Sequence, residues 1–335
     1  METCEQRSIK LQRWGSRFTE ADVPEMSVLL PTYRRPDALL RTLQSLEKQT
    51  VDEGAVEIVV IDDGSDDCTE KVLVEFAEKT KSSFSFAVLG KNGGPARARN
   101  VGLGMCRGSI ILIIGDDIEP DCALLDRHLS FHRQNRDETS ALLGHVSFPE
   151  ALKPNAFMRW LEKGGRKYFF NYQGLMPMQE VEPIFFYTCN VSVKLSLLEK
   201  SGWFDESFPY ASHEDIELGY RLAEHGMHLI YDPDAKGFHW HMLSVKGIAK
   251  RVYLMGYSAV LFWKKVKNDG SRLRVVARKL LAHFSATPLF VWFWNWLHRK
   301  QYKDDKKYPL CWQILLFLSF FIGLSDAANK KSPRL

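Results

Sequence analysis

Two adjacent carboxylates, Asp116 and Asp117, follow a run of branched aliphatic residues in the segment GSIILIIGDDIEPD, residues 108–121. Two carboxylates so close together repel each other unless a cation lies between them, and their oxygens are ligands that divalent metals accept. The pair therefore predicts a divalent-metal site that receives a phosphorylated ligand. A solvated Asp-Asp turn is the alternative that this segment alone leaves open.

Three further groups of polar residues follow predicted strands in the same way. They are Thr32 and Tyr33 after MSVLLP, Asp62 and Asp63 after EIVVI, and residues 92–99, a glycine-rich loop that runs into a helix. Carboxyl ends of parallel strands meet at one edge of a sheet, where ligands bind, so we expect these groups to converge. No GxGxxG follows the first strand and no GxxxxGK[ST] is present, which disfavours a dinucleotide site and a P-loop.

A second pair of carboxylates, Glu214 and Asp215, occurs in the segment HEDIELGYRL. The apolar residues Ile216, Leu218 and Leu222 that follow have helical spacing, which places both carboxylates in the first turn of an amphipathic helix. The helix macrodipole stabilises ionised carboxylates there. Helix capping and acid–base chemistry are both consistent with this position.

Strands and amphipathic helices alternate from residue 26 to about residue 114, and they must position these side chains. Apolar strands are predicted at MSVLLP, EIVVI, residues 84–89 and residues 110–114, with helices between them. This alternation predicts an α/β fold with a doubly wound, mostly parallel sheet.

The motifs in their order resemble the family 2 glycosyltransferases of the GT-A fold. They are SVLLPTYRRPDALLRTLQSL, EIVVIDDGSDD, NGGPARARNVGL, IILIIGDDIEPD and TCNVSVKLSLLEKSGWFDESFPYASHEDIELGYRLAEHG. The resemblance covers residues 27–241. It implies a GT-A domain at 26–245, with a nucleotide-sugar half (26–122) and an acceptor half (123–245), after a polar leader (1–25) outside the fold.

The resemblance also implies roles for the residues of the donor site. Thr32 and Tyr33 would line the pocket for the base and ribose, and Asp63 would accept a hydrogen bond from the base. Arg97 would reach the base or the diphosphate, and Asp116 would lie near the ribose. A nucleotide-diphosphate sugar is the donor that these roles require.

The metal site implied by the resemblance contains Asp117 and a histidine, with Mn²⁺ or Mg²⁺ as the ion. His239, in the segment GFHWHM, aligns best with the family's histidine, and His241 is the alternative ligand. The two histidines share a face if the preceding strand continues. The first acidic position of the family's metal motif is Gly115 here. This departure weakens the expectation of a two-carboxylate clamp.

The general base that the resemblance implies is Asp215, with Glu214 holding the acceptor. Transfer with inversion needs one carboxylate to take the proton of the acceptor hydroxyl, opposite the leaving diphosphate. The expected reaction is metal-dependent sugar transfer to a hydroxyl of a lipid-linked or cell-surface glycan precursor. A binding protein without catalysis and a nucleotidyltransferase are the alternatives.

The C-terminal region, residues 246–335, is basic and aromatic. From residue 236 onward the chain has 19 Lys and Arg against 4 Asp and Glu. Its apolar blocks 286–297 and 310–324 are shorter than the roughly 20 residues of a perpendicular span. We expect them to lie in a membrane interface rather than to bind nucleic acid. A buried helical subdomain or an oligomer contact is the alternative.

The cysteine pattern indicates the compartment. The chain has six cysteines with no CxxC pair and no zinc spacing. This pattern is typical of a reduced, cytosolic chain. We therefore expect the protein at the cytoplasmic face of a membrane, bound peripherally or monotopically.

Overall fold

The computed structural model describes residues 9–14, 23–52, 54–163, 165, 169–208, 210–266, 288–299 and 308–334. The chain divides into two compact units. Unit 1 consists of residues 1–147, 175–207 and 214–240, and unit 2 of residues 148–174, 208–213 and 241–335. Residues 148–174, 208–213 and 241–245, which we expected inside the 26–245 domain, are grouped with the C-terminal residues in unit 2. Segment 148–174 supplies Phe157 and Leu161 to the core of that unit.

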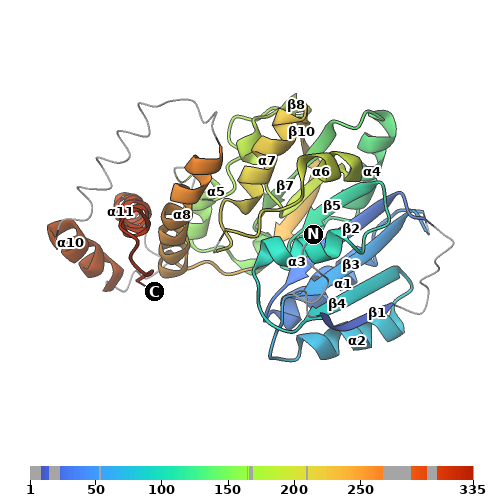
Figure 1. Ribbon diagram of the computed structural model, residues 1–335, viewed down its shortest axis with the longest axis horizontal. Coiled ribbons are helices and arrows are strands. Elements are labelled where there is room, and N and C mark those ends of the chain that lie inside the picture. Colours follow the sequence, from blue (N-terminus) through green and yellow to red (C-terminus); the bar gives the residue numbers. More distant parts are fainter. Residues whose placement is uncertain are drawn as a thin grey trace. The chain divides into compact units, whose positions relative to one another are not determined.

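Unit 1 is built on one mixed sheet (Figure 1). Its strands are β1 (Ile9–Trp14), β2 (Met26–Thr32), β3 (Val56–Asp62), β4 (Ser83–Leu89), β5 (Ile110–Ile114), β6 (Ile118–Pro120), β7 (Ser140–Ser147), β8 (Gln179–Glu180), β9 (Asn190–Lys194) and β10 (His228–His239). Their order is β1-β4-β3-β2-β5-β9-β7-β10-β6, with β8 beside β10.

The helices of unit 1 connect and cover these strands. They are α1 (Pro36–Leu46), α2 (Thr69–Lys79), α3 (Pro95–Leu103), α4 (Leu124–Gln134), the 3₁₀ turn η3 (Pro183–Phe185), α6 (Leu195–Ser201) and α7 (Glu214–Glu224). Helix α3 packs on β2 and β3, while α4 packs on β7 and β10.

The sheet confirms the α/β prediction but corrects its strand directions. Strands β4, β3, β2 and β5 are parallel, as the alternation predicts. Strand β9 is antiparallel to both of its neighbours, β5 and β7, and β1, β6 and β8 also pair antiparallel. Strands β7 and β10 are parallel as well, so the sheet is mixed. The antiparallel pairs were not predicted, because alternation with helices reveals strand direction only where it occurs.

The expected polar leader also contains part of the sheet. Ile9–Trp14 forms β1 and pairs antiparallel with β4. The segment IKLQRW alternates apolar and polar residues only from Ile9 to Gln12, a run too short to predict a strand. Because β1 covers β4, the backbone groups on that edge of β4 are paired rather than exposed.

Unit 2 is helical. Its elements are η2 (Glu150–Leu152), α5 (Ala156–Glu162), α8 (Val245–Lys265), α10 (Pro288–Arg299) and α11 (Pro309–Ala328). Helices α8 and α11 lie side by side (Figure 1). A Cβ at Gly256 would meet the carbonyl of Phe320, and one at Gly323 would meet that of Tyr253, so glycine allows the two backbones to touch.

Helix α11 is longer than the apolar block that we expected. It has 20 residues and is the one helix in the described part of the chain that is long and apolar enough to cross a membrane. Of its apolar 18-residue window, 61% is buried inside the protein, where it contributes to a core with α5, α8 and α10. A mostly buried apolar helix is also what the core of a soluble protein contains, so length alone assigns no membrane.

Candidate active site

Asp116 and Asp117 lie at the carboxyl end of β5, and both are buried. The hydroxyl of Thr32 donates to Asp116 Oδ2 at 2.8 Å, and that of Thr42, on α1, donates to the Asp116 carbonyl at 2.9 Å. Burial, followed by the charge of Asp117, raises the pKa of the Asp116 carboxyl above its usual range. The site therefore favours a nearby cation.

His239 is brought to Asp117 by strand pairing. The last residue of β10 lies opposite Ile118 of β6, directly after Asp117 in the chain. His239 Nε2 is 3.5 Å from Asp117 Oδ2, and the Trp240 backbone N–H donates to the Asp117 carbonyl at 2.9 Å. Strand β10 ends at His239, so His241 does not continue it. Strand pairing thus places His239 at the carboxylate.

Arg35 also reaches this pair of carboxylates, which we did not expect from the sequence. Its Nη1 is 2.6 Å from Asp117 Oδ2 and 3.3 Å from Asp116 Oδ1. Burial lowers the pKa of Arg35, but the two carboxylates outweigh it and raise the pKa above its ordinary value. The guanidinium thus supplies the positive charge that the two carboxylates attract.

The donor set for a metal is small. Nowhere in the described residues do three or more His, Cys, Asp or Glu side chains form a group that could hold a metal ion. Asp117 and His239 offer one carboxylate and one imidazole, a combination that Mn²⁺ accepts. Mg²⁺ and similar ions are commonly held by one or two carboxylates together with substrate phosphates and water. The described residues alone supply an incomplete set of ligands, which the oxygens of a diphosphate would complete.

Asp63 lies beside this cluster and holds the glycine-rich loop. Its carboxylate accepts hydrogen bonds from the backbone N–H groups of Gly93 at 2.9 Å and Gly94 at 2.7 Å. Its own N–H donates to the Thr32 carbonyl at 2.9 Å, which joins this loop to the first group. Burial raises the pKa of Asp63 to about 6, although the two amides and Arg97 oppose the shift.

The remaining donor-site residues flank the same loops. Arg97 is buried on α3, and its side chain occupies the space where a Cβ of Gly93 would lie. Tyr33 is half-buried, and the guanidinium carbon of Arg34 lies 5.1 Å from its ring centre. Both residues are thus placed near the strand ends, where we expected them to be. Their contacts with a donor stay predictions.

The acceptor-side pair begins α7, as we predicted from the helical spacing. Glu214 is buried, and its Oε1 accepts a hydrogen bond from Arg99 Nη1 at 3.0 Å. Its Oε2 is buried with no hydrogen-bond partner among the described residues. Asp215 is partly exposed, and its Oδ1 accepts a hydrogen bond from the Ile216 backbone N–H at 2.8 Å.

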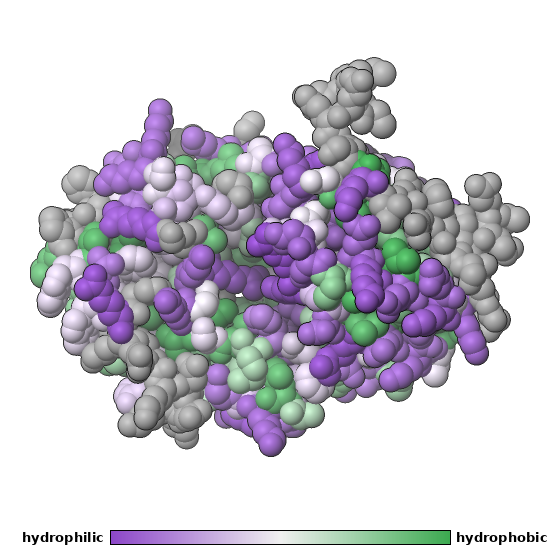
Figure 2. All heavy atoms as spheres, turned by 90° about the horizontal axis from the view of Figure 1, so that it is seen from below, coloured by the Kyte–Doolittle hydropathy of each residue, from purple (hydrophilic) through white to green (hydrophobic). Residues whose placement is uncertain are grey.

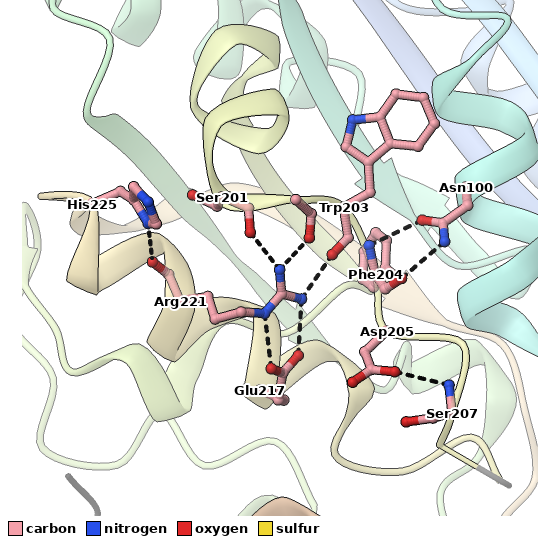
Figure 3. A network of polar contacts seen from close by, with 10 residues as sticks. Asn100, Ser201, Trp203, Phe204, Asp205, Ser207, Glu217, Arg221 and His225 are labelled. Atoms are coloured by element: carbon pink, nitrogen blue, oxygen red, sulfur yellow. Dashed lines mark hydrogen bonds and ion pairs between the residues drawn. The ribbon is translucent and has the colours of Figure 1, made fainter. Parts of the chain in front are cut away.

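A network of polar contacts ties α3 and α6 to α7 (Figure 3). The Asn100 side chain both accepts from and donates to the backbone of Phe204, at 2.9 Å each. Arg221 on α7 points toward the end of α6 and donates to the carbonyls of Ser201, Gly202 and Trp203. It also pairs with Glu217. The glycine-rich loop's helix and the helix of Asp215 are therefore connected through side chains.

The structure thus brings the predicted residues together in linked groups. Thr32, Asp116, Asp117 and His239 form the first, Asp63 and the glycine-rich loop the second, and Glu214 the third, through Arg99. We missed Arg35, Arg99 and Asn100. Arg99 and Asn100 belong to the motif PARARN. Two arginines that are two positions apart in a helix face different neighbours, so this spacing indicated that Arg99 has a partner other than that of Arg97.

Comparison with known proteins agrees with this geometry. Residues 27–195 match the family described as "Glycosyl transferase family 2". The validoxylamine A glucosyltransferase of Streptomyces hygroscopicus subsp. limoneus is 27% identical over 234 residues, which cover 64% of this chain and 51% of that protein. The chain spans about half the length of the curated relatives of this kind.

Two solved structures have the same fold. The mannosyltransferase PcManGT of Pyrobaculum calidifontis, in complex with GDP-Man and Mn²⁺, is similar with a TM-score of 0.59 at 18% identity, covering 96% of this chain and 91% of that one. TarS of S. aureus, residues 1–349, has a TM-score of 0.52 at 17% identity, covering 92% and 93%. At these identities the likeness concerns the fold, which is GT-A.

Proposed function

Because this chain belongs to glycosyl transferase family 2, whose members are glycosyltransferases that use nucleotide-sugar donors, we propose that it transfers a sugar to a hydroxyl with inversion and with the help of a divalent metal. The observation that carries the proposal is the cluster at the end of β5. Asp116, Asp117 and His239 converge there, and Arg35 provides positive charge.

The residues of this cluster fit a metal that binds together with a diphosphate. Asp117 and His239 would hold the ion, and the donor's phosphates would supply further oxygens. Support comes from the PcManGT structure, which contains GDP-Man and Mn²⁺. When bound, a divalent ion would neutralise the charge that develops on the leaving diphosphate.

The protein's own groups account for the remaining chemistry. Asp215 would take the proton of the acceptor hydroxyl, whose oxygen then attacks the anomeric carbon as the bond to the diphosphate breaks on the opposite face. Glu214 would accept a hydrogen bond from the acceptor at its Oε2. Thr32 donates a hydrogen bond to the Asp116 carboxylate, which would lie near the ribose.

We further propose that the acceptor is a lipid-linked or cell-surface glycan precursor and that the enzyme works at the cytoplasmic face of a membrane. Leu289, Trp292 and Trp296 support this, since their i, i+3, i+7 spacing places them on one face of α10, where they are exposed by 71%, 62% and 43%. Exposed tryptophans on a basic segment suit a membrane interface. On the view of the molecule in Figure 2, hydrophilic residues predominate among the described ones, with smaller hydrophobic patches between them.

Release of nucleoside diphosphate from a panel of UDP- and GDP-sugars tests the proposal. The assay is run with Mn²⁺, with Mg²⁺ and with EDTA, and Asp117→Ala serves as the matched variant. We expect release with at least one donor, dependent on metal and lost in Asp117→Ala. Release unaffected by EDTA would contradict the metal. Absence of release and of sugar-nucleotide binding across the panel would contradict the donor class, whereas binding without release would favour the non-catalytic alternative.

A further inference from the structure

Arg35 occupies the position that a cation would take between the two carboxylates. Its Nη1 lies within hydrogen-bond distance of Asp117 Oδ2, the oxygen that also faces His239, and touches Asp116 as well. The carboxylates are buried, with side-chain exposures of 8% and 11%, whereas the Arg35 side chain is 44% exposed. The guanidinium therefore enters from the solvent side and can leave the same way.

The loop before α1 directs the two neighbouring arginines to different partners. Arg34 has a left-handed backbone, with φ of 53°, which an arginine rarely adopts. Its N–H donates to Ser65 Oγ at 2.8 Å, and its guanidinium pairs with the exposed Asp66 at 2.6 Å. Strained residues held in this way cluster at functional sites. The turn at Arg34 leaves Arg35, directly before α1, pointing at the carboxylates.

A metal ion held between His239 and Asp117 Oδ2 would compete with Arg35 for that oxygen. A metal would sit about 2.0–2.1 Å from the carboxylate oxygen. The guanidinium nitrogen is already 2.6 Å from that oxygen, so it would lie within a few ångströms of the ion. Two positive charges at this separation in a partly buried site repel each other strongly. One of the two must move, and the exposed Arg35 side chain is the mobile one.

We propose that Arg35 is an internal counter-cation that keeps free metal out of the site. When the donor binds, its diphosphate pairs with the Arg35 guanidinium and draws it away from the carboxylates. This inference rests on the proposed metal and donor. A guanidinium matches two phosphate oxygens in a bidentate pair. When Arg35 turns to the diphosphate, Asp117 becomes available to the ion that the same diphosphate brings. Metal and nucleotide then bind cooperatively, and the coupling is reciprocal.

Titration of Mn²⁺ alone, followed by electron paramagnetic resonance of the free ion, tests the first half of the proposal. Arg35→Gln removes the counter-cation, and we expect it to bind Mn²⁺ about tenfold or more tightly than the wild type. Arg34→Gln is the matched control, because it removes the same charge one residue away from a side chain that pairs with Asp66 instead. It should bind Mn²⁺ like the wild type.

Titration of Mn²⁺ in the presence of saturating UDP or GDP tests the second half. In the wild type, the nucleotide should increase the Mn²⁺ affinity by more than it does in Arg35→Gln, because only the wild type has a guanidinium to be released. Arg35→Lys provides a further variant if Arg35→Gln does not fold. Its ammonium is a single point charge without the bidentate fork, so its coupling should lie below that of the wild type.

Two contrary outcomes separate this inference from the function on which it rests. Equal Mn²⁺ affinity and equal coupling in the wild type and in the Arg35 variants would overturn the role of Arg35 and leave the metal site in place. Failure of every protein, the wild type included, to bind Mn²⁺ even with UDP or GDP would overturn the metal dependence itself. If Arg34→Gln also binds Mn²⁺ more tightly, and by as much as Arg35→Gln, the effect comes from the lower net charge alone. This outcome would also contradict the proposal.

Discussion

The individual carboxylates of the site lie in different environments, and these differences indicate their roles. Asp116 and Asp117 are buried beside a guanidinium, Asp63 is buried against backbone amides, and Asp215 is partly exposed at the start of a helix. A partly exposed carboxylate at a helix N-terminus is accessible to an incoming hydroxyl, from which a general base takes the proton. Asp215 meets this requirement best.

Asp215→Asn should reduce turnover while leaving donor binding nearly unchanged. The amide cannot take a proton, and removal of a general base typically costs about 10²–10⁴ in rate. Initial rates at saturating donor, together with the affinity for UDP or GDP, check this. Asp215→Glu is the matched variant that keeps the base and should retain more activity than Asp215→Asn. Wild-type turnover in Asp215→Asn would show that another group is the base.

Asp63 should make the stability of the protein depend on pH between about 4 and 6. Its pKa is about 6 in the folded protein, above the ordinary value of 3.8 for an aspartate, so ionisation of Asp63 costs folding free energy. The free energy of unfolding should therefore fall as the pH rises from about 4 to about 6, by up to about 3 kcal/mol from this group, and level off above. Urea unfolding at pH 4.5 and pH 7 measures the fall.

Asp63→Asn isolates this contribution, because it cannot ionise there. The fall between the two pH values should be smaller in the variant than in the wild type, whatever constant change in stability the substitution itself brings. An equal fall in both proteins would assign the pH dependence to other groups, such as Asp116 or Asp62.

The sequence predicted the convergence of Thr32, Asp116 and Asp117, because the carboxyl ends of parallel strands meet at one edge of a sheet. The family resemblance, rather than any residue pattern, placed His239 beside them. The sequence did not predict Arg35, since the direction of a long side chain in a loop depends on a left-handed residue before it, which no pattern of residue types reveals. Nor did it predict that the Asp63 carboxylate holds the glycine-rich loop. Contacts of this kind depend on loop geometry rather than on periodicity.

At the scale of elements, α3 connects the donor loop to the helix of Asp215. Arg99 on α3 and Glu214 on α7 form a buried ion pair, with side-chain exposures of 10% and 5%. Asn100, the next residue of α3, holds the backbone of Phe204. These contacts position Asp215 relative to the loop that would receive the donor.

Arg99→Met should destabilise the protein and also lower kcat. Removal of one partner leaves Glu214 buried and unpaired, which costs about 3–5 kcal/mol. A small displacement of Asp215 should lower kcat by about tenfold or more, with the donor KM nearly unchanged. Urea unfolding and steady-state kinetics at a temperature where the variant is folded provide the two measurements.

Arg107→Met is the matched control for this substitution. Arg107 forms an ion pair of 2.8 Å with the buried Glu57, so its loss should also destabilise unit 1. Arg107 lies outside the α3–α7 contacts, and kcat of the folded variant should stay near that of the wild type. An equal loss of kcat in both variants would mean that Arg99 acts through general stability alone.

The elements themselves were predicted unevenly. The parallel strands β2 to β5 and their helices follow from the alternation of apolar runs with amphipathic segments. The antiparallel strand β9 was not predicted as such, because NVSVK carries no sign of its direction, and its two neighbours, β5 and β7, are distant in sequence. The grouping of segments 148–174 and 208–213 with unit 2 was not predicted for a similar reason, since long-range contacts leave no local pattern.

At the scale of the whole molecule, charge is distributed unevenly along the chain. The residues from 236 onward carry 19 Lys and Arg against 4 Asp and Glu. Each basic residue near an anionic membrane surface contributes about 1 kcal/mol, which salt screens, whereas burial of apolar side chains adds a part that salt does not remove. Binding to a membrane should therefore have both components.

Flotation with anionic vesicles tests this proposal at low and at high salt. The wild type should float under both conditions, and less at high salt. The double variant Trp292→Ser/Trp296→Ser should lose the vesicle binding that remains at high salt, because both side chains are exposed on α10. Met176→Ser, which replaces an exposed apolar residue of unit 1, is the control and should float like the wild type. A wild type that stays in solution at low salt would contradict membrane association.

The most direct test of the whole account is a calorimetric titration of UDP and GDP, with and without Mn²⁺, into the wild type, Asp117→Ala and Asp215→Asn. We predict that Mn²⁺ strengthens nucleotide binding in the wild type and equally in Asp215→Asn, and that Asp117→Ala loses this gain, because in our proposal Asp117 holds the ion and Asp215 acts only on the acceptor. An unchanged effect of Mn²⁺ in Asp117→Ala, or its loss in Asp215→Asn, would contradict the assignment of the two carboxylates.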